Sequence, residues 1–466
     1  MRTRSTCAVR CVVAVWVTVA LGCGGSGGQR SDGGGDAGAD GMGVEDASQG
    51  DAGVLPDVAV SDGSVDAGGQ PGTACTPLPP PQGTVIEVGP SQVDELPAIV
   101  AQAATGTTIL LLDGTYMLSG GDAKHRLSFT TPGVTLRGKS GQREAVILDG
   151  NYATSEIISI AASDVTIADL TVRRAYNHPI HITGGPSGDI TGVLLHNVRV
   201  SDPGQQAIKI NPSAQGHYAD QGRIECSLIE LTAEGRQHVR DNCYTGGIDA
   251  HAAWGWQVRL NTIRGFWCLT GLSEHGIHFW RASRDTLVER NQVLDCARGI
   301  GFGLGESGTG QDRVYADNPY AGVGYLGHVD GIIRNNFVWA TISGHDSGIS
   351  LEQSRGTLVV HNSVVSIERP FSSIEWRWDH TSVRIVNNLV SHELVARDGA
   401  TAEQEGNITY VNPVVFVNAV GGDLHLNPTT AAIAVDKGAP LDPGVCDEDI
   451  DGESRSGPRD VGADEL

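Results

Sequence analysis

The sequence of 466 residues predicts an all-β fold, a right-handed parallel β-helix in which short strands of successive coils stack into long sheets. Two short phrases recur along the chain, out of step with each other. The composition is rich in glycine (63 residues) and poor in aromatic residues (5%), which is typical of a turn-rich protein. A β-sandwich also has many short strands, but the fixed order of the two phrases within each repeat favours the solenoid.

The first phrase places a small or cyclic residue before an isoleucine and an apolar residue two positions after it. Because strand side chains alternate between faces, these apolar residues are expected in the core and the residues beside them on the outside. The outer positions change their chemistry from copy to copy. The copies are Pro179-Ile180-His181-Ile182, Ala207-Ile208-Lys209-Ile210, Gly247-Ile248-Asp249-Ala250, Gly276-Ile277-His278-Phe279, Gly299-Ile300-Gly301-Phe302, Gly348-Ile349-Ser350-Leu351 and Ser373-Ile374-Glu375-Trp376.

The second phrase is a short strand followed by a turn with asparagine, as in Val258-Arg259-Leu260-Asn261. Asparagine tolerates left-handed backbone and hydrogen bonds locally, which suits it to turns. Stacked from coil to coil, these residues are expected to form a ladder. One interval is longer and contains a glycine-rich insertion, residues 305–327. The aligned residues are Asn261, Asn291, Asn336, Asn362 and Asn388.

The N-terminus predicts an exported protein. Three arginines precede an apolar run from Cys11 to Leu21, which is too short for a permanent transmembrane helix. The run ends in Ala20-Leu21-Gly22-Cys23, which resembles the lipobox of bacterial lipoproteins, with Ala20 where leucine is usual. We therefore expect residues 1–23 to be a signal peptide and Cys23 to carry lipid, on the outer membrane or surface of a Gram-negative bacterium. An ordinary secretory signal is the alternative.

Residues 24–74 predict a disordered tether. They consist mainly of Gly, Asp, Ala and Ser, and such a segment buries too little apolar surface to offset its conformational entropy. Its acidic residues should keep it extended, as a spacer between the membrane and the folded part. Its Asp-Gly pairs could bind calcium, but a solvated linker is the favoured interpretation.

The start of the folded part does not follow the repeat. An amphipathic helix is predicted over Leu96–Ala104, before Thr105-Gly106. It is followed by the phrases Asp113-Gly114-Thr115-Tyr116, Val134-Thr135-Leu136-Arg137-Gly138 and Leu148-Asp149-Gly150. This order resembles the N-terminal end of pectate-lyase-like β-helix proteins. The open end of a solenoid needs an atypical capping unit, and the resemblance assigns that role to the helix.

One β-helix domain is expected over 75–466, with the cap and first coils at 75–156, the remaining coils at 157–410 and a closing segment at 411–466. The acidic residues from Asp447 to Glu465 resemble the closing segment of secreted bacterial β-helix proteins. Gly452 falls one place early for a helix–loop–helix calcium loop, so an acidic cap is favoured over a calcium site. Calcium is the only candidate cofactor, and no metal site is predicted.

Six cysteines remain after the leader and Cys23, and an even number in an exported chain favours disulfides. Coil geometry favours the bridges Cys226–Cys243 and Cys268–Cys296, and Cys75–Cys446 is the pair that remains. No Cys-x-x-Cys spacing supports zinc.

The net charge of −23 argues against nucleic acid as a partner. The partner expected instead is a polysaccharide, with contact to the membrane only through the lipid. A monomer is expected.

If the coils are in register, the outer residues of the first phrase converge on one face. The structural alternative is a polar ladder without function, but such faces usually carry Thr, Ser, Asn and Lys rather than imidazoles beside a carboxylate and a tryptophan. The candidate catalytic residues are Lys209, Asp249, His251, His278 and Arg281. The candidate substrate-binding residues are His181, Asn211, Trp280, His275, Arg298, Glu352 and Glu375.

This set fits β-elimination or C5 epimerisation of a uronic-acid polysaccharide, with the lyase reaction favoured. Such a site needs a base for the C5 proton, a cation for the neighbouring carboxylate and a proton donor. Imidazole titrates near neutral pH, so His251 or His278 is the predicted base. Lys209 or Arg281 is the predicted cation. Asp249 could orient a ring nitrogen, and Trp280 offers a flat face for a pyranose.

Gly247-Ile248-Asp249-Ala250-His251 resembles the Asp-Pro-His phrase of the β-helix alginate C5-epimerases. Ala250 stands for the usual proline and Ala252 for the usual acid, so the match covers three residues. The resemblance implies His251 as the base and Arg281 or Arg284 as the partner of the substrate carboxylate.

Three other functions remain open. Glu352 and Glu375 on adjacent coils could hydrolyse a glycoside, although an ion pair between Glu352 and Arg377 is the simpler expectation. Asp249, His251 and His278 have the side chains of a metal site, but no helical His-Glu-x-x-His frame supports one. A surface-anchored glycan-binding or structural β-helix would use tryptophans as sugar platforms. Those tryptophans are Trp254, Trp256, Trp267 and Trp280.

Overall fold

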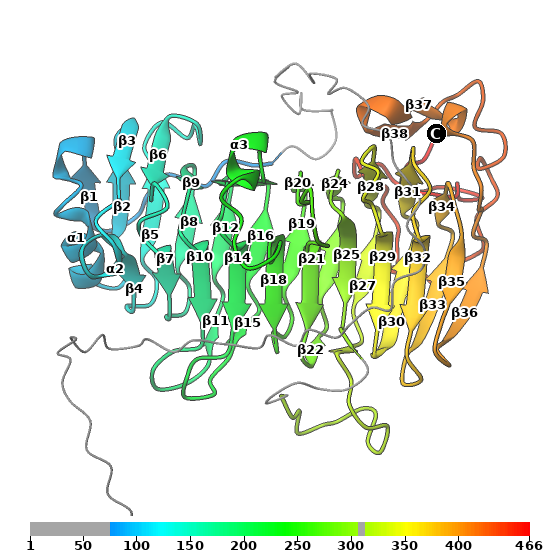
Figure 1. Ribbon diagram of the computed structural model, residues 1–466, viewed down its shortest axis with the longest axis horizontal. Helices are drawn as coiled ribbons and strands as arrows, with labels where there is room; N and C mark the ends of the chain where they lie inside the picture. Colours follow the sequence, from blue (N-terminus) through cyan, green and yellow to red (C-terminus); the bar gives the residue numbers. More distant parts are fainter. Residues whose placement is uncertain (1–74, 306–312) are drawn as a thin grey trace, which may run out of the picture. The chain divides into compact units, whose positions relative to one another are not determined.

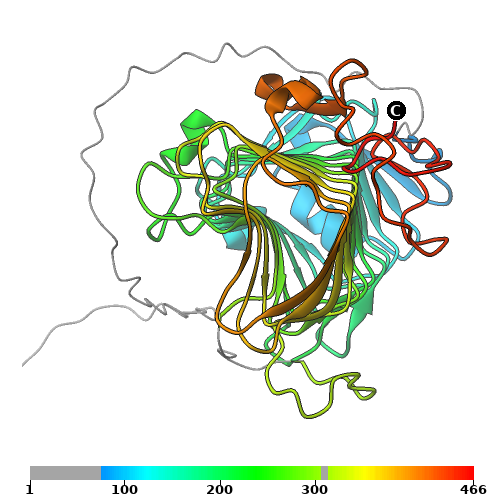
Figure 2. The same cartoon turned by 90° about the vertical axis from the view of Figure 1, so that its right-hand side faces the viewer.

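The computed structural model describes residues 75–305 and 313–466, and their fold is the predicted right-handed parallel β-helix (Figure 1). The signal peptide and tether expected at 1–74 lie outside the described residues. Three parallel sheets, named sheets A, B and C here, run along the stack of coils. Figure 2 looks along this stack and shows the strands of successive coils superposed around the core.

Sheet C is formed by the first phrase. Its isoleucines pair with one another from Ile180 to Ile374 and are all fully buried, as predicted. Each such side chain stabilises the fold by about 1.5–3 kcal/mol relative to its exposed state. Its strands are β4 (Leu127–Phe129), β7 (Glu156–Ile160), β10 (His178–Thr183), β14 (Gln206–Asn211), β18 (Gly246–His251), β21 (His275–Trp280), β25 (Arg298–Phe302), β29 (Ser347–Glu352), β32 (Ser372–Arg377) and β35 (Leu394–Ala396).

The second phrase forms sheets A and B, on either side of the asparagine turn. Sheet A contains β1 (Val85–Val88), β2 (Thr108–Leu111), β5 (Thr135–Gly138), β8 (Thr166–Ala168), β12 (Leu194–His196), β16 (Arg223–Glu225), β19 (Gln257–Arg259), β22 (Ser283–Arg284), β23 (Leu287–Glu289), β26 (His328–Val329), β27 (Ile332–Arg334), β30 (Ser354–Val360), β33 (Ser382–Val386) and β36 (Thr401–Glu405). Sheet B contains β3 (Gly114–Met117), β6 (Val146–Asp149), β9 (Thr171–Arg173), β13 (Arg199–Ser201), β17 (Leu228–Glu230), β20 (Thr262–Arg264), β24 (Gln292–Leu294), β28 (Phe337–Ala340), β31 (Ser363–Ser366) and β34 (Leu389–Val390).

Short elements complete the fold. The predicted capping helix is α1 (Leu96–Gln102), which packs on β4 and buries Leu96 and Val100. The closing segment packs its apolar residues, among them Phe416, on outer residues of sheet B such as Phe337. Among the described residues, no helix is long and apolar enough to cross a lipid bilayer. The remaining elements are α2 (Asp122–His125), α3 (Ala233–Arg236), η1 (Pro90–Gln92), η2 (Pro413–Val415), η3 (Ala419–Gly421), β11 (Ile190–Thr191), β15 (Ala219–Asp220), β37 (Phe416–Asn418) and β38 (Asp423–Leu426).

The asparagine ladder is confirmed. Each side-chain amide donates to the Oδ1 of the asparagine on the next coil, at 2.9–3.0 Å. The ladder continues to Asn407, which the repeat pattern does not mark. Asn336 also donates to the backbone oxygen of Val288, so one side chain satisfies polar groups on two coils.

Replacing Asn336 with alanine is expected to lower the free energy of unfolding by about 2–3 kcal/mol. The side chain is fully buried, and its loss leaves the Asn291 backbone N–H and the Val288 carbonyl without this partner, at about 1–3 kcal/mol for each unsatisfied group. Urea unfolding followed by circular dichroism measures the change. Asn318→Ala, at an exposed turn, is the control and should cost much less. Equal costs for the two variants would contradict a stabilising role of the ladder.

The cysteine pairing differs from the prediction. The bridges are Cys75–Cys226 and Cys243–Cys268, whereas Cys296 and Cys446 are buried free thiols. All three expected pairs are therefore wrong.

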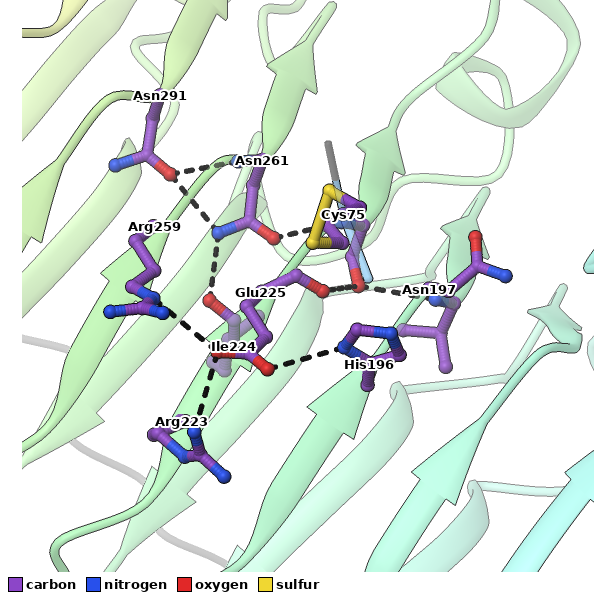
Figure 3. Close-up of a disulfide and its surroundings, with 12 residues drawn as sticks. Cys75, His196, Asn197, Arg223, Ile224, Glu225, Arg259, Asn261 and Asn291 are labelled. Atoms are coloured by element: carbon purple, nitrogen blue, oxygen red, sulfur yellow. Dashed lines mark hydrogen bonds and ion pairs between the residues drawn. A yellow bond between two sulfur atoms is a disulfide. The ribbon is translucent and has the colours of Figure 1, made fainter. Parts of the chain in front are cut away.

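The path of the chain before β1 explains the first difference. This segment runs beside sheet A, where Arg137 donates to the Pro79 oxygen at 2.9 Å, and it reaches Cys226 just after β16 (Figure 3). In the second bridge, Cys243 and Cys268 join two insertions that lie outside the repeat. Two disulfides indicate an exported protein, because such bridges persist in oxidising compartments.

Candidate functional site

Sheet C brings the predicted catalytic residues together. Lys209 on β14 pairs in register with Asp249 on β18, and Asp249 pairs with His278 on β21. Beside them, His251 pairs with Trp280. The predicted columns of outer side chains are therefore present, because the strand period of two is kept through all three coils.

Asp249 is the centre of this group. Lys209 Nζ donates to Asp249 Oδ2 at 2.5 Å, and Trp280 Nε1 donates to Oδ1 at 2.7 Å. His251 Nε2 lies 3.3 Å from Asp249 Oδ2 and 3.0 Å from Lys209 Nζ. We call Lys209, Asp249 and His251 the buried triad. A charge-assisted network of this kind holds its members in one geometry.

The buried triad is not exposed, which corrects the predicted open face. The exposed fractions are 7% for Lys209, 2% for Asp249, 5% for His251 and 0% for His278. Two insertions explain this difference. Tyr244, before β18, has its ring centre 6.0 Å from Lys209 Nζ, and Glu274, before β21, has Oε2 3.7 Å from His278 Nδ1.

The Cys243–Cys268 bridge ties these two insertions to each other beside sheet C. The open rim of the site consists of partly exposed side chains. They are those of Asn211, Tyr244, Glu274, Trp280 and Arg281.

Electrostatics fix the charges of the buried triad at neutral pH. Burial alone would raise the pKa of Asp249, but the Lys209 ammonium and the His251 contact hold it well below its usual range. Burial would lower the pKa of Lys209, but Asp249 and Tyr244 raise it. Burial and the Lys209 charge lower the pKa of His251 to about 4. The triad is therefore an ammonium, a carboxylate and a neutral imidazole.

Two further histidines of the predicted set lie close to the triad. The His275 and His278 rings are 4.3 Å apart between centres, and His278 stacks on Trp280. The His275 ring fills the space beside Gly301, because its Nε2 would lie 2.6 Å from a Cβ at position 301. Towards the N-terminus, His181 Nε2 contacts Asn211 Oδ1 at 2.5 Å.

The remaining predicted residues lie apart and have other partners. Glu375 pairs with Arg397 at 3.0 Å, and Glu352 Oε2 accepts hydrogen bonds from the Gly305 amide and Trp378 Nε1. The expected ion pair of Glu352 with Arg377 is wrong, because Arg377 pairs with Asp398 at 2.6 Å. Arg298 lies 3.8 Å from Asp346.

Tyr244 and Glu274 belong to the site although the sequence did not indicate them. Both stand in insertions, so no repeat marks their positions. The one feature of the sequence that could indicate them is the pair Cys243 and Cys268 in the same insertions, because a bridge between these cysteines brings the insertions together. Coil geometry alone predicts other partners for both cysteines.

A cavity of about 480 Å³ lies elsewhere, between sheet A and the closing segment. It contains none of the predicted catalytic or substrate-binding residues. Its wall alternates charges along register-paired strands, Glu225, Arg259, Glu289 and Arg334, and neighbours in this row form ion pairs. Figure 3 shows the Glu225 end of this row beside Cys75.

Comparisons with known proteins agree with the fold. The family model described as periplasmic copper-binding protein (NosD) matches residues 225–415. The crystal structure of pectate lyase Pel9A is similar, with a TM-score of 0.51 and 14% identity over 82% of this chain and 96% of that chain. At this identity the similarity shows the fold alone. No curated protein sequence matches this chain significantly.

Two other solved structures resemble the chain less. The polygalacturonase of Erwinia carotovora ssp. carotovora has a TM-score of 0.38 and 11% identity over 73% of this chain and 96% of that chain. The A-module of the Azotobacter vinelandii mannuronan C-5 epimerase AlgE4 has a TM-score of 0.34 and 12% identity over 69% of this chain and 93% of that chain.

Proposed function

We propose that this exported β-helix acts on a uronic-acid polysaccharide by β-elimination, with the buried triad as the centre of its active site. The observation that carries the proposal is the contact of Asp249 with both Lys209 and His251, beneath the rim residues Trp280 and Arg281. The similar fold of a pectate lyase makes polysaccharides the substrate class to test first.

His251 is the proposed base. Lys209 Nζ lies 3.0 Å from His251 Nε2 and, as an ammonium, can only donate, so Nε2 carries the lone pair and the buried Nδ1, which has no hydrogen-bond partner among the described residues, carries the proton. Asp249 orients the ring, and the imidazole is neutral because burial and Lys209 lower its pKa to about 4. A neutral imidazole is the form that removes a proton, here through the lone pair at Nε2 once the Lys209 contact opens.

Three other residues are proposed for the remaining steps of the reaction. Arg281 on the rim faces the substrate carboxylate, and its charge stabilises the carbanion that forms when the C5 proton leaves. Trp280 stacks on a sugar ring. As the double bond between C4 and C5 forms, the C4–O bond breaks, and the leaving oxygen takes a proton. Tyr244 is the proposed proton donor, because burial and Asp249 raise its pKa and keep its hydroxyl protonated at neutral pH.

The test is the ultraviolet absorbance of unsaturated products on a panel of polymers containing galacturonate, glucuronate, mannuronate or guluronate. At least one polymer is expected to give a rising absorbance, and Arg281→Gln should lower kcat/KM on that polymer. Deuterium uptake at C5 without cleavage would identify an epimerase, in which the proton returns to the opposite face. If no polymer gives either unsaturated products or deuterium uptake at C5, both catalytic proposals are overturned.

Non-catalytic glycan binding is the second candidate, and the burial of the triad favours it. The polar groups of Lys209 and Asp249 already satisfy one another, as in a structural network. Binding would then use the partly exposed Trp280 and its neighbours. Affinity electrophoresis on the same polymers distinguishes the two functions, because a binder is retarded and yields no product.

A further inference from the structure

Three metal-ligand atoms converge at the start of β21, beside the buried triad. Glu274, His275 and His278 each offer one atom, and these atoms lie within 4.8 Å of one another. Glu274 directly precedes β21 and His275 is its first residue, so both lie at the entrance to the strand. We call these three residues the His–Glu cluster. It stands on its own contacts and does not rest on the proposed polysaccharide activity.

The cluster is unusual because its inner polar atoms lack partners. Glu274 Oε2, His275 Nδ1 and His278 Nδ1 are buried and have no hydrogen-bond partner among the described residues. The exposed fractions are 1% for His275 and 0% for His278. A buried polar atom without a partner destabilises the folded state, so native proteins rarely leave three of them together.

The opposite nitrogens of both rings are already engaged. His278 Nε2 lies 3.0 Å from the Gly303 oxygen and donates to it, because a carbonyl only accepts. In the neutral ring, His278 Nδ1 therefore carries the lone pair. His275 Nε2 contacts Ser350 Oγ at 2.6 Å, which holds its ring with Nδ1 free. A histidine that donates one ring N–H to a carbonyl or hydroxyl is the usual support of a metal-bound imidazole.

Space and charge also fit a cation. Gly301 has no side chain, and the His275 ring occupies the room that a Cβ would fill. Glu274 brings a negative charge, and Asp249 Oδ1 lies 3.9 Å from His278 Nδ1 as a second carboxylate nearby. The Glu274 side chain is 23% exposed, so the cluster has a way to solvent.

We propose that Glu274, His275 and His278 bind one divalent transition-metal ion through Oε2 and the two Nδ1 atoms. Bonds of about 2.0–2.2 Å in a tetrahedral site place ligand atoms roughly 3.3 Å apart. Glu274 Oε2 and His278 Nδ1 are 3.7 Å apart, so side-chain rotations complete the site. Two imidazoles and one carboxylate suit Zn²⁺ or Cu²⁺, with Cu²⁺ bound more tightly, whereas Ca²⁺ and Mg²⁺ prefer oxygen ligands.

The test uses the full mature chain without a histidine tag, stripped with a chelator. Equilibrium dialysis against Cu²⁺, Zn²⁺ or Ca²⁺ alone is expected to give one tight equivalent of Cu²⁺ or Zn²⁺ and none of Ca²⁺. With Cu²⁺ bound, electron paramagnetic resonance should show coupling to two nitrogens. Absence of a tight equivalent, or Ca²⁺ binding that equals Zn²⁺ binding, would overturn the proposal.

Variants locate the ion. Glu274→Gln keeps the shape of the side chain and should weaken binding at least tenfold, and His278→Asn should remove a nitrogen coupling. Gly301→Ala should also weaken binding, because its Cβ displaces His275, whereas Gly344→Ala meets nothing within 4 Å and serves as the control. Circular dichroism reports whether each variant is folded. If Glu274→Gln and Gly301→Ala are both folded and both bind Cu²⁺ or Zn²⁺ with unchanged affinity, the ion binds elsewhere and the proposal is wrong.

Discussion

Replacing Lys209 with methionine is expected to lower the free energy of unfolding by about 3–5 kcal/mol, because it leaves a buried carboxylate without its cation. Asp249 is 2% exposed, and its closest cation is the Lys209 ammonium at 2.5 Å. The low pKa of Asp249 depends on that charge. Without it, the carboxyl group must take up a proton or remain charged in an apolar setting, and both disfavour the folded state. Urea unfolding at neutral pH measures the loss.

The sequence supplies a matched control for this prediction. Lys139 forms an ion pair of similar length with Glu87, at 2.7 Å, but both side chains are about half exposed. Lys139→Met should therefore cost less than about 1 kcal/mol. The double variant Lys209→Met with Asp249→Leu removes both charges and should regain much of the stability. If the double variant is as unstable as Lys209→Met, packing rather than charge explains the loss.

Replacing His251 with alanine is expected to lower turnover by about 10²–10⁴-fold on whichever polymer is cleaved, which is the usual contribution of a positioned base. The neutral imidazole is the active form. Since its pKa is about 4, activity that depends on this base should rise as the pH increases through about 4 and then level off. Initial rates of product absorbance over a pH series measure both effects.

His380 provides the control for this variant. It lies in the turn between β32 of sheet C and β33 of sheet A, and its Nδ1 contacts the Tyr325 backbone oxygen at 2.8 Å. His380→Ala should leave turnover unchanged. Turnover that survives in folded His251→Ala would exclude His251 as the base and leave His278 as the other predicted candidate.

The repeat itself could be predicted from the sequence because every coil restates it. The buried isoleucines, the Asn261–Asn388 ladder and the register of Lys209 with Asp249 and His278 all follow from a period of two within strands and a fixed order between them. Register needs no knowledge of loops. It is set wherever one face of a strand must remain apolar.

The insertions could not be predicted in the same way. The burial of the triad depends on Tyr244 and Glu274. The disulfides depend on the path of the chain segments outside the repeat that contain Cys75 and Cys243. Nothing periodic constrains these segments, so their paths are decided by tertiary contacts alone. The same limit applies to His275, because its packing over Gly301 depends on how two neighbouring coils approach each other.

The triad and the His–Glu cluster lie on three consecutive strands of sheet C, β14, β18 and β21, except for Glu274, which directly precedes β21. The later coils, from β29 to β35, keep the same register while contributing only Ser350, through its contact with His275, to this chemistry. Duplication or loss of a whole coil beyond β29 would therefore change the length of the molecule without separating the reactive side chains. We therefore expect variants in which a coil beyond β29 is deleted or duplicated to keep the same chemistry.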